Sequence, residues 1–378
     1  MRLKRLHGRI GEQWRWMKRL NHHYLYLVIM EKRNSNSQLA NCLLSWINLR
    51  STLVFCVLTF MICIAMYGTM SATTRRLYTD TINRNILQRH LAKTSLKLRT
   101  WENNITRRAE LRTRLDEHMK HTSFVCTQEN TPIGAQYFDT FHSKKTMGID
   151  AEKQRLLPKV SPFSNTTFKT CSIVGNSGIL NNSKCGREID SWDFVMRSNL
   201  QQIQPFVEDA GKKMNLTSLS PSLIVSRYKL FGKEFDVTNL LEAMQEYVGY
   251  MLWIPNSKGN AVMTFPVTQL VQENTEIEVL LLNSEHTEKF QEFWQLSKKT
   301  ISTGLTLVSI ALSMCEELHL YGFWPFPLTA DGQSVEMHYS GDLQWSSYFS
   351  HHDYPSEFDL LTKLHYQGIL KLHVDKCY

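Results

Sequence analysis

The feature that most constrains this chain is an uncharged run of 20 residues, STLVFCVLTFMICIAMYGTM, at positions 51–70. At about 1.5 Å of rise per residue, a helix of about 20 residues crosses the apolar core of a bilayer. A cleaved signal peptide is the rival interpretation, but the run is too long, starts too late and lacks an obvious cleavage site. The run therefore predicts a transmembrane signal-anchor over residues 51–70.

Positive charge is concentrated on the N-terminal side of the chain. The net charge of the 378 residues is +8, and residues 1–50 account for it with ten Lys or Arg and two Asp or Glu. Residues 71–125 carry +7, and the rest of the chain carries −7. This distribution argues against a basic nucleic-acid groove in the main domain. The positive-inside rule predicts a cytosolic tail at 1–50 and a lumenal location for residues 71–378.

Sequons and cysteines agree with a lumenal main domain. Four Asn-X-Ser/Thr acceptors follow the apolar run, at Asn104, Asn165, Asn181 and Asn215. Five of the eight cysteines also follow the run, and lumenal cysteines form disulfides. We therefore predict N-glycosylation at the four asparagines and disulfide bonding in the main domain.

The lumenal part divides into a stem and a main domain. Residues 71–125 are polar with scattered Leu and Ile, and they predict a loose helical stem. In residues 126–378, the strand-like runs CSIVG, FVMRSNL, MLWIP, IEVLLLN and HLYGFW are separated by helical stretches, which include 222–246 and 304–317. This alternation predicts an α/β domain with a mostly parallel sheet, helices on both faces and ligand-binding loops after the strands.

Three clusters carry candidate chemistry. The loop Gly175-Asn176-Ser177-Gly178 lets a backbone approach a ligand and offers an amide side chain, although an ordinary tight turn fits equally well. Ser302 or Thr303 can cap a helix from Gly304, and its exposed amides suit a carboxylate or phosphate; a plain N-cap is the simpler interpretation.

The third cluster contains His338-Tyr339 and the segment from His351 to Glu357. Histidine can take a proton from a hydroxyl near neutral pH. A zinc site is the alternative, but the spacing is not that of a zinc-binding HExxH helix and His351 and His352 are adjacent. General base chemistry is therefore the preferred interpretation of the histidines.

In this order, the clusters resemble the four sialylmotifs of the animal sialyltransferase family. Cys171–Leu200 is similar to the large motif, Ser302–Phe326 to the small motif, His338-Tyr339 to the third motif and His352…Glu357 to the H-x4-E motif. The strings GFWPF and HYQGILKLHVDKC are similar to the α2,8-sialyltransferase branch. The resemblance implies a variant glycosyltransferase A-like (Rossmann-like) domain that transfers sialic acid from CMP-sialic acid without a metal or cofactor. The absence of any D-x-D motif from the sequence agrees with metal independence.

The resemblance also implies roles for individual residues. His352 is the expected general base, and His338 is expected to face the leaving phosphate. The expected donor-binding residues are Asn176, Ser177, Gly178, Asn199, Ser302, Thr303, Gly304, Phe323 and Trp324. Expected disulfides join Cys171 to Cys315 and Cys185 to Cys377. Cys126 is left over, and it is compatible with a homodimer link or a free thiol.

Two positions depart from the family pattern. The third motif usually continues with an aromatic residue and an acid, where this chain has Ser340-Gly341. The large motif usually has an unpaired Cys where this chain has Ser198. The first departure motivates an alternative: a catalytically weak paralogue that acts as a lumenal sialoglycan-binding or regulatory protein. An ordinary membrane-anchored receptor domain leaves the four ordered motifs unexplained.

The expected acceptor ends in sialic acid, because the resemblance is to the α2,8 branch. Gangliosides (hence ganglioside biosynthesis), glycoprotein oligosaccharides and polysialic acid all fit. Polysialylating members carry a dense basic stretch before the large motif, whereas residues 126–170 here hold only scattered basic residues, at Lys144, Lys145, Lys153, Arg155, Lys159 and Lys169. We therefore predict mono- or oligosialylation by a single-pass type II protein of the Golgi membrane.

Overall fold

The computed structural model describes residues 57–62, 72–119, 124–138, 146–164, 166–220, 223–224, 227–228, 237–246, 249–255, 261–296, 299–347 and 352–377. In these ranges no helix is both long and apolar enough to cross a bilayer. The predicted anchor at residues 51–70 lies outside them, except for the helical residues 57–62. Likewise, the predicted tail at 1–50 and the sequon residue Asn165 lie outside the described residues.

The chain divides into two compact units. One comprises residues 1–93 and 330–332, within which the Arg84 guanidinium donates to the Gly332 carbonyl over 3.1 Å. The other comprises residues 94–329 and 333–378 and contains the sheet and all the predicted site residues. The site therefore belongs to the second unit alone.

Within the described residues, seven strands of the second unit form one parallel sheet in the order β7-β6-β5-β4-β3-β8-β9. The strands are β3 (Phe168–Val174), β4 (Phe194–Arg197), β5 (Leu216–Ser218), β6 (Met251–Ile254), β7 (Glu278–Leu281), β8 (Cys315–Tyr321) and β9 (Lys371–Leu372). The short strands β1 (Gln136–Phe138) and β2 (Thr146–Gly148) pair with each other in antiparallel fashion. The predicted parallel α/β architecture is confirmed.

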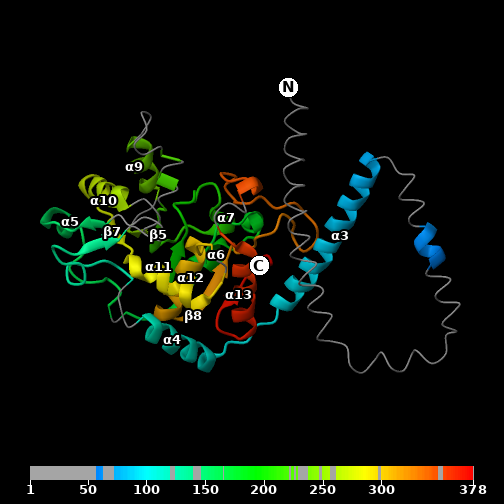
Figure 1. Cartoon of the computed structure of the whole chain (residues 1–378), viewed down its shortest axis with the longest axis horizontal. Helices are drawn as coiled ribbons and strands as arrows, with labels where there is room; N and C mark the ends of the chain where they lie inside the picture. The colour runs from blue at the N-terminus through cyan, green and yellow to red at the C-terminus, as the bar shows by residue number, and fades with distance from the viewer. Residues whose placement is uncertain are drawn as a thin grey trace. The chain divides into compact units, whose positions relative to one another are not determined.

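Helices connect the strands and cover the sheet. They are α4 (Ile105–Met119), α5 (Ala151–Arg155), α6 (Gly186–Ser191), α7 (Val207–Ala210), α9 (Val237–Gln245), α10 (Ala261–Asn274), α11 (Ser284–Trp294), α12 (Thr303–Met314) and α13 (Tyr354–Tyr366), with 3-10 turns at Gly178–Leu180 and Trp345–Ser347. The long helix α3 (Ala72–Leu98) precedes them in the chain and belongs mostly to the first unit. Helix α12 packs on β3 and β8, and α4 packs on α11 and α12 (Figure 1). The central strands β3 and β4 are buried where they pair, which explains their nearly continuous apolar sequences.

Two details differ from the sequence-based expectations. The helix expected over 304–317 ends at Met314, because Cys315–Glu317 pairs with Phe168–Thr170 as the start of β8. Strand β5 was not predicted, since it has only three residues. Pairing with β4 and β6 on either side keeps this short strand in the sheet.

Helix α4 is an integral part of the second unit, although it falls within the stem predicted at residues 71–125. Its Leu111, Leu115 and Met119 are buried. The buried Arg108 donates from Nε to the Ile369 carbonyl over 2.9 Å, and Arg112 donates to the Leu312 carbonyl over 3.0 Å, at the end of α12. Arginine at a helix C-terminus satisfies carbonyls that have no partner within the helix. The remaining domain boundaries stay predictions.

Candidate active site

The site is centred where the order of the sheet reverses, between β3 and β8. Strand β3 leads to β4 on one side, whereas β8 comes much later in the chain and pairs on the other side. In open parallel sheets, ligands bind outside the carboxyl ends of the strands at such a switch point. Val174, Arg197 and Tyr321 are in register across β3, β4 and β8, so the loops that follow start from the same edge.

Two glycines allow the loops after β3 and β8 to meet. The amide of Gly175 donates to the Tyr321 carbonyl over 2.8 Å, and the amide of Ser177 donates to the Gly322 carbonyl over 3.1 Å. A Cβ atom at Gly175 would lie 2.6 Å from the Gly322 oxygen, and Gly322 has a φ of +71°. Only glycine fits this backbone approach without displacement, so both loops are fixed at their first residue.

The loop after β3 holds the first predicted donor-binding residues. The Ser177 hydroxyl donates to the Trp324 carbonyl over 2.7 Å and accepts from the Ile179 amide, so Ser177 is a buried structural link between the two loops. The Asn176 carbonyl accepts from the Tyr339 amide over 2.8 Å. The half-buried side chain of Asn176 forms no hydrogen bond with the described part of the chain, so it remains available to a ligand.

The loop after β4 presents Asn199 in a left-handed conformation, with φ of 63°. Its side-chain oxygen accepts from the Ser218 hydroxyl and from the Ser220 amide, each over 3.2 Å. These bonds fix the oxygen and leave the amide nitrogen as the donor for a ligand. Such a donor suits a phosphate or a base carbonyl.

The third-motif segment, His338-Tyr339, forms hydrogen bonds with both the loop after β3 and the loop after β4. In addition to the bond from Tyr339 to Asn176, the Tyr339 hydroxyl donates to the Gln202 carbonyl over 3.0 Å. His338 Nδ1 lies 2.8 Å from Asp342 Oδ1 and 3.4 Å from Gln201 Nε2. The structure therefore brings His338 beside the loops that hold Asn176 and Asn199.

The N-terminus of α12 forms the second half of the site. The Ser302 hydroxyl caps the helix by accepting from the Leu305 amide over 3.1 Å. The side chain of Glu357, from α13, accepts hydrogen bonds from both the amide (2.7 Å) and the hydroxyl of Ser302. No acceptor for the amides of Thr303 and Gly304 is found among the described residues. Helix amides without partners favour an anion.

Phe323 lies between the two halves. A Cβ atom at Gly175 would lie 3.1 Å from the Phe323 ring, and one at Gly304 would lie 3.0 Å from the same ring. Trp324 is only 2% exposed, and its indole N–H donates to the Leu328 carbonyl over 2.8 Å. Phe323 thus lies at the predicted donor pocket, whereas Trp324 supports the loop from the core.

His352 precedes α13, beside the chain that leads into α12. Its Nδ1 lies 2.8 Å from the Thr300 carbonyl, which makes Nδ1 the protonated nitrogen and leaves Nε2 as the acceptor nitrogen of the neutral ring. Asp353 caps α13 by accepting from the Ser356 amide, and Glu357 one turn later reaches Ser302. The H-x4-E spacing therefore places a potential base, His352, and the carboxyl group that binds Ser302, Glu357, at the same end of α13.

Glu357 is a buried acid with a shifted pKa. It is only 6% exposed, and burial raises its pKa from 4.5 to about 7, although the hydrogen bonds from Ser302 partly oppose the shift. Asp353, one turn away, raises this pKa further. Proton occupancy at Glu357 therefore changes near neutral pH.

A cavity of about 430 Å³ adjoins the His338 half of the site. It is lined by Leu200, Gln202, Arg227, Tyr228, Asn239, Ala243, Glu246, Ser340 and Asp342. Arg227 forms an ion pair with Asp342. Gln201, Arg227 and Asp342 were not predicted from the sequence. Gln201 and Arg227 belong to no recognised motif, and the family pattern has its acid at the position of Gly341. An acid one residue later, at Asp342, was the one sequence feature that could have indicated this contact.

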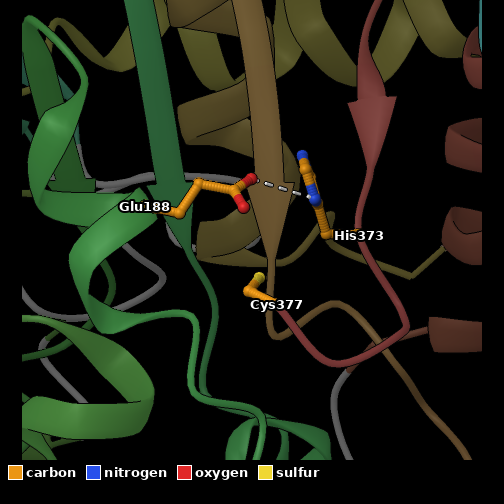
Figure 2. Close-up of side chains that lie close together, drawn as sticks. All are labelled: Glu188, His373 and Cys377. Atoms are coloured by element: carbon orange, nitrogen blue, oxygen red, sulfur yellow. Dashed lines mark ion pairs between the residues drawn. The ribbon is translucent and has the colours of Figure 1, made fainter.

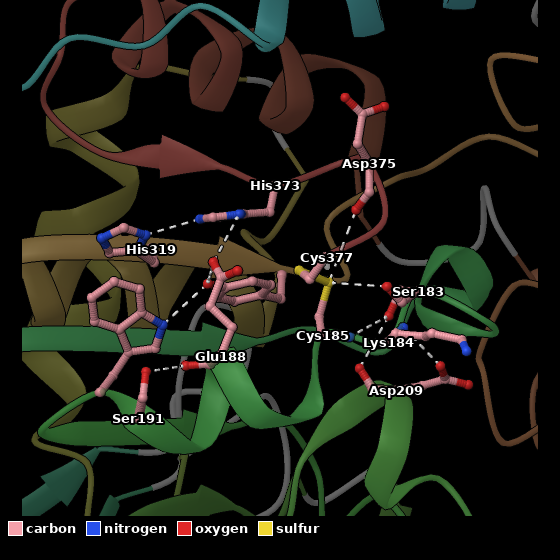
Figure 3. Close-up of a disulfide and its surroundings, with 12 residues drawn as sticks. Ser183, Lys184, Cys185, Glu188, Ser191, Asp209, His319, His373, Asp375 and Cys377 are labelled. Atoms are coloured by element: carbon pink, nitrogen blue, oxygen red, sulfur yellow. Dashed lines mark hydrogen bonds and ion pairs between the residues drawn. A yellow bond between two sulfur atoms is a disulfide. The ribbon is translucent and has the colours of Figure 1, made fainter.

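Both predicted disulfides are confirmed. Cys171 is bonded to Cys315 and Cys185 to Cys377, with Cα–Cα separations of 6.0 and 4.8 Å. The first bond joins β3 to the start of β8. The second holds the C-terminal segment against the start of α6 (Figure 3).

A cluster of Glu188, His373 and Cys377 lies beside the second disulfide (Figure 2). His373 Nδ1 is 3.5 Å from Glu188, and its other nitrogen is 2.9 Å from His319 (Figure 3). A metal would require the Cys377 thiolate, but this sulfur is bonded to Cys185. Burial also holds the pKa of His373 well below its ordinary value. We therefore regard the cluster as a structural network that anchors the C-terminus.

Cys126 and the sequons lie outside the site chemistry. Cys126 is free and 3% exposed, and burial raises the pKa of its thiol to about 12, so this thiol is not placed to link two chains. The Asn104 oxygen accepts from the Arg107 amide at the start of α4. The Asn181 amide donates to the Tyr339 carbonyl over 3.4 Å, and the Asn215 oxygen accepts from the Val195 amide. Glycosylation of these residues and homodimer formation stay predictions.

The fold and the site define an α/β protein whose parallel sheet has hydrogen-bond donors at its switch point that suit a polar, anionic ligand. Residues 116–369 match glycosyltransferase family 29 (sialyltransferase). An alpha-N-acetylneuraminide alpha-2,8-sialyltransferase of Xenopus tropicalis is 38% identical over 264 residues, which cover 67% of this chain and 74% of that protein. The chain therefore belongs to glycosyltransferase family 29, the sialyltransferases, as its motifs predict.

Two solved structures are also similar. A crystal structure of a mammalian sialyltransferase has a TM-score of 0.43 at 21% identity and covers 60% of this chain and 77% of that one. A mammalian sialyltransferase in complex with Gal-beta-1-3GalNAc-ortho-nitrophenol has a TM-score of 0.45 at 18% identity, with coverages of 74% and 89%. Because both TM-scores are below 0.5, the family assignment rests on the sequence matches.

Proposed function

We propose that this glycosyltransferase moves sialic acid from CMP-sialic acid to the terminal sialic acid of a glycolipid or glycoprotein glycan, with an α2,8 linkage. The family match supports the donor, and the similarity to an alpha-2,8-sialyltransferase supports the linkage. The observation that carries the proposal is the convergence of all four sialylmotifs at one edge of the sheet. Three hydrogen bonds connect the motifs there. The Ser177 hydroxyl donates to the Trp324 carbonyl, the Tyr339 amide to the Asn176 carbonyl, and the Ser302 amide to the Glu357 side chain.

The donor is held by two groups of residues. The amide nitrogens of Asn176 and Asn199 bind the cytidine monophosphate part, beside the backbone of Ser177 and Gly178. The sialic acid carboxylate accepts from the amides of Thr303 and Gly304, at the positive end of α12. Phe323 lies between the two halves, with its ring close to both Gly175 and Gly304.

The transfer is a single inverting displacement. His352 Nε2 takes the proton of the acceptor hydroxyl, whose oxygen forms a bond to the anomeric carbon of the donor sugar. The bond from that carbon to the phosphate oxygen breaks, and CMP leaves with the electron pair. His338 stabilises the charge on the departing phosphate. Each positioned group of this kind contributes about 10²–10⁴-fold in rate.

Metal independence, membrane anchoring and Golgi location belong to the same proposal. The donor carries one phosphate, so less charge needs neutralising than in a nucleoside diphosphate sugar. The uncharged run at residues 51–70 supports a single-pass type II anchor with the enzyme in the lumen.

The test is a transfer assay with the full-length chain in detergent micelles, in the presence of a metal chelator. The acceptors are glycolipids and glycoproteins that end in α2,3- or α2,6-linked sialic acid. We expect CMP release with a new α2,8 linkage, and we expect both to be lost in His352→Ala. If the protein binds CMP but releases none from the donor with any acceptor, the weak-paralogue alternative replaces this proposal.

A further inference from the structure

The ring of His338 is fixed by an acid that the family pattern does not predict. Asp342 Oδ1 lies 2.8 Å from His338 Nδ1, and the Gly341 amide donates to the His338 carbonyl over 3.0 Å. Gly341 has a φ of +70°, which turns the chain so that the next residue folds back over His338. The acid absent at position 341 is therefore supplied from position 342.

Asp342 is itself held in place mainly by Arg227, whose guanidinium pairs with its Oδ2. The Ser340 hydroxyl lies 2.9 Å from its Oδ1, but it also lies 2.7 Å from Gln201 Oε1, so its single hydrogen is shared between the two acceptors. Burial alone would raise the pKa of Asp342. The hydrogen bond and charge of His338, with Ser340 and Arg227, hold this pKa well below its ordinary value instead. The group is therefore a carboxylate at any working pH, and it can accept but not donate.

We propose that Asp342 is a positioning residue for the transfer reaction: it binds His338 Nδ1–H and so leaves Nε2 as the nitrogen that meets the leaving phosphate. The contact with Gln201, at 3.4 Å, is too long to compete with the carboxylate at 2.8 Å. This role rests on the proposed function of His338. It also removes the main reason to consider the chain catalytically weak.

The backbone explains why the acid works at position 342 and not at 341. A Cβ atom placed at Gly341 would have no neighbour within 4 Å, so a side chain there would extend into open space. The double variant Gly341→Asp with Asp342→Gly restores the usual family spacing. We expect it to be as defective as Asp342→Gly alone, because its carboxylate cannot reach His338.

Arg227 makes Asp342→Asn a sharp test. A guanidinium can only donate, so the oxygen of the introduced amide must face Arg227 and its NH₂ group must face His338. The Nδ1 atom must then accept a hydrogen bond, and the ring can no longer carry a proton on both nitrogens. We expect kcat to fall at least about tenfold while the dissociation constant for CMP stays unchanged.

The measurement combines kinetics with nitrogen NMR on the full-length chain in micelles, labelled with ¹⁵N-histidine. The signal of His338 is identified by its loss in His338→Gln. We expect a protonated-type Nδ1 signal in the wild type and an unprotonated-type signal in Asp342→Asn. In Arg227→Ala with Asp342→Asn the amide can rotate, so both the protonated-type signal and part of kcat should return.

Glu336→Gln is the matched control. Glu336 is an exposed acid two residues before His338, and its side chain forms no hydrogen bond or ion pair in the described part of the chain. The control should keep the wild-type spectrum and rate. An unprotonated-type Nδ1 signal in the wild type, or a wild-type kcat in Asp342→Asn, would overturn the proposal. If Asp342→Asn unfolds, the wild-type spectrum still decides. A wild type that transfers no sialic acid refutes the proposed function but leaves these spectra valid.

Discussion

The side chain of Glu357 accepts hydrogen bonds from both the amide and the hydroxyl of Ser302, 55 residues earlier in the chain. The first residue of the H-x4-E motif, His352, lies 2.8 Å from the Thr300 carbonyl, two residues before Ser302. The proposed base before α13 and the proposed carboxylate site at the start of α12 are therefore connected through the same hydrogen-bonded contact between the two helix starts. A change at Glu357 should affect donor binding although Glu357 does not touch the donor.

We expect Glu357→Ala to destabilise the protein and weaken donor binding. Two donors of Ser302 lose their acceptor in a buried site, which costs about 2 kcal/mol in the free energy of unfolding. The loosened N-terminus of α12 should raise KM for CMP-sialic acid at least as much as it lowers kcat. Glu357→Gln, which keeps one acceptor and one donor for Ser302, is the control and should be milder in both respects. Equal KM values for Glu357→Ala and the wild type would contradict this.

Glu357 also predicts how stability depends on pH. Its pKa is about 7 in the folded protein and about 4.5 in the unfolded chain. Between these values the folded state keeps a proton that the unfolded state has released. The free energy of unfolding should therefore fall as pH rises from about 4.5 to about 7, by on the order of 3 kcal/mol, and level off above. Chemical denaturation of wild type and Glu357→Gln across this range tests it, since the variant should lack this component.

Ser198 predicts a stabilising substitution. Its side chain is buried, and its hydroxyl has no hydrogen-bond partner among the described residues. An unsatisfied buried hydroxyl costs about 1–3 kcal/mol. Ser198→Ala, or Ser198→Cys, which restores the usual family residue, should raise the melting temperature without changing kcat. Thermal unfolding decides this, and a lower melting temperature for both variants would show that the hydroxyl has a partner.

The sequence predicted the class of fold and the site motifs because these depend on local patterns. Buried parallel strands are continuous apolar runs, so β3, β4 and β6 were recognisable, whereas the three-residue β5 depends on its neighbours. The disulfides were predictable from the family resemblance alone. Asp342 was not, because its contact with His338 depends on the left-handed turn at Gly341. The burial of Trp324, which was expected to help form the donor pocket, was also not predictable, because it depends on tertiary contacts of its ring with the core.

Short products are the last expectation, and the structure adds a reason for it. Of the basic residues before the large motif, Lys153 forms an ion pair with Asp150, and the Arg155 side chain donates to the Ala151 carbonyl within α5. Asp150 offsets the charge of Lys153, whereas Arg155 keeps its charge but is held along α5, so less positive charge is left to hold an extended polyanion. We therefore expect one or a few sialic acids per acceptor when reaction products are separated by chain length. Long polymers formed at low salt and lost on charge reversal of Lys153 and Arg155 would show instead that this segment guides a growing chain.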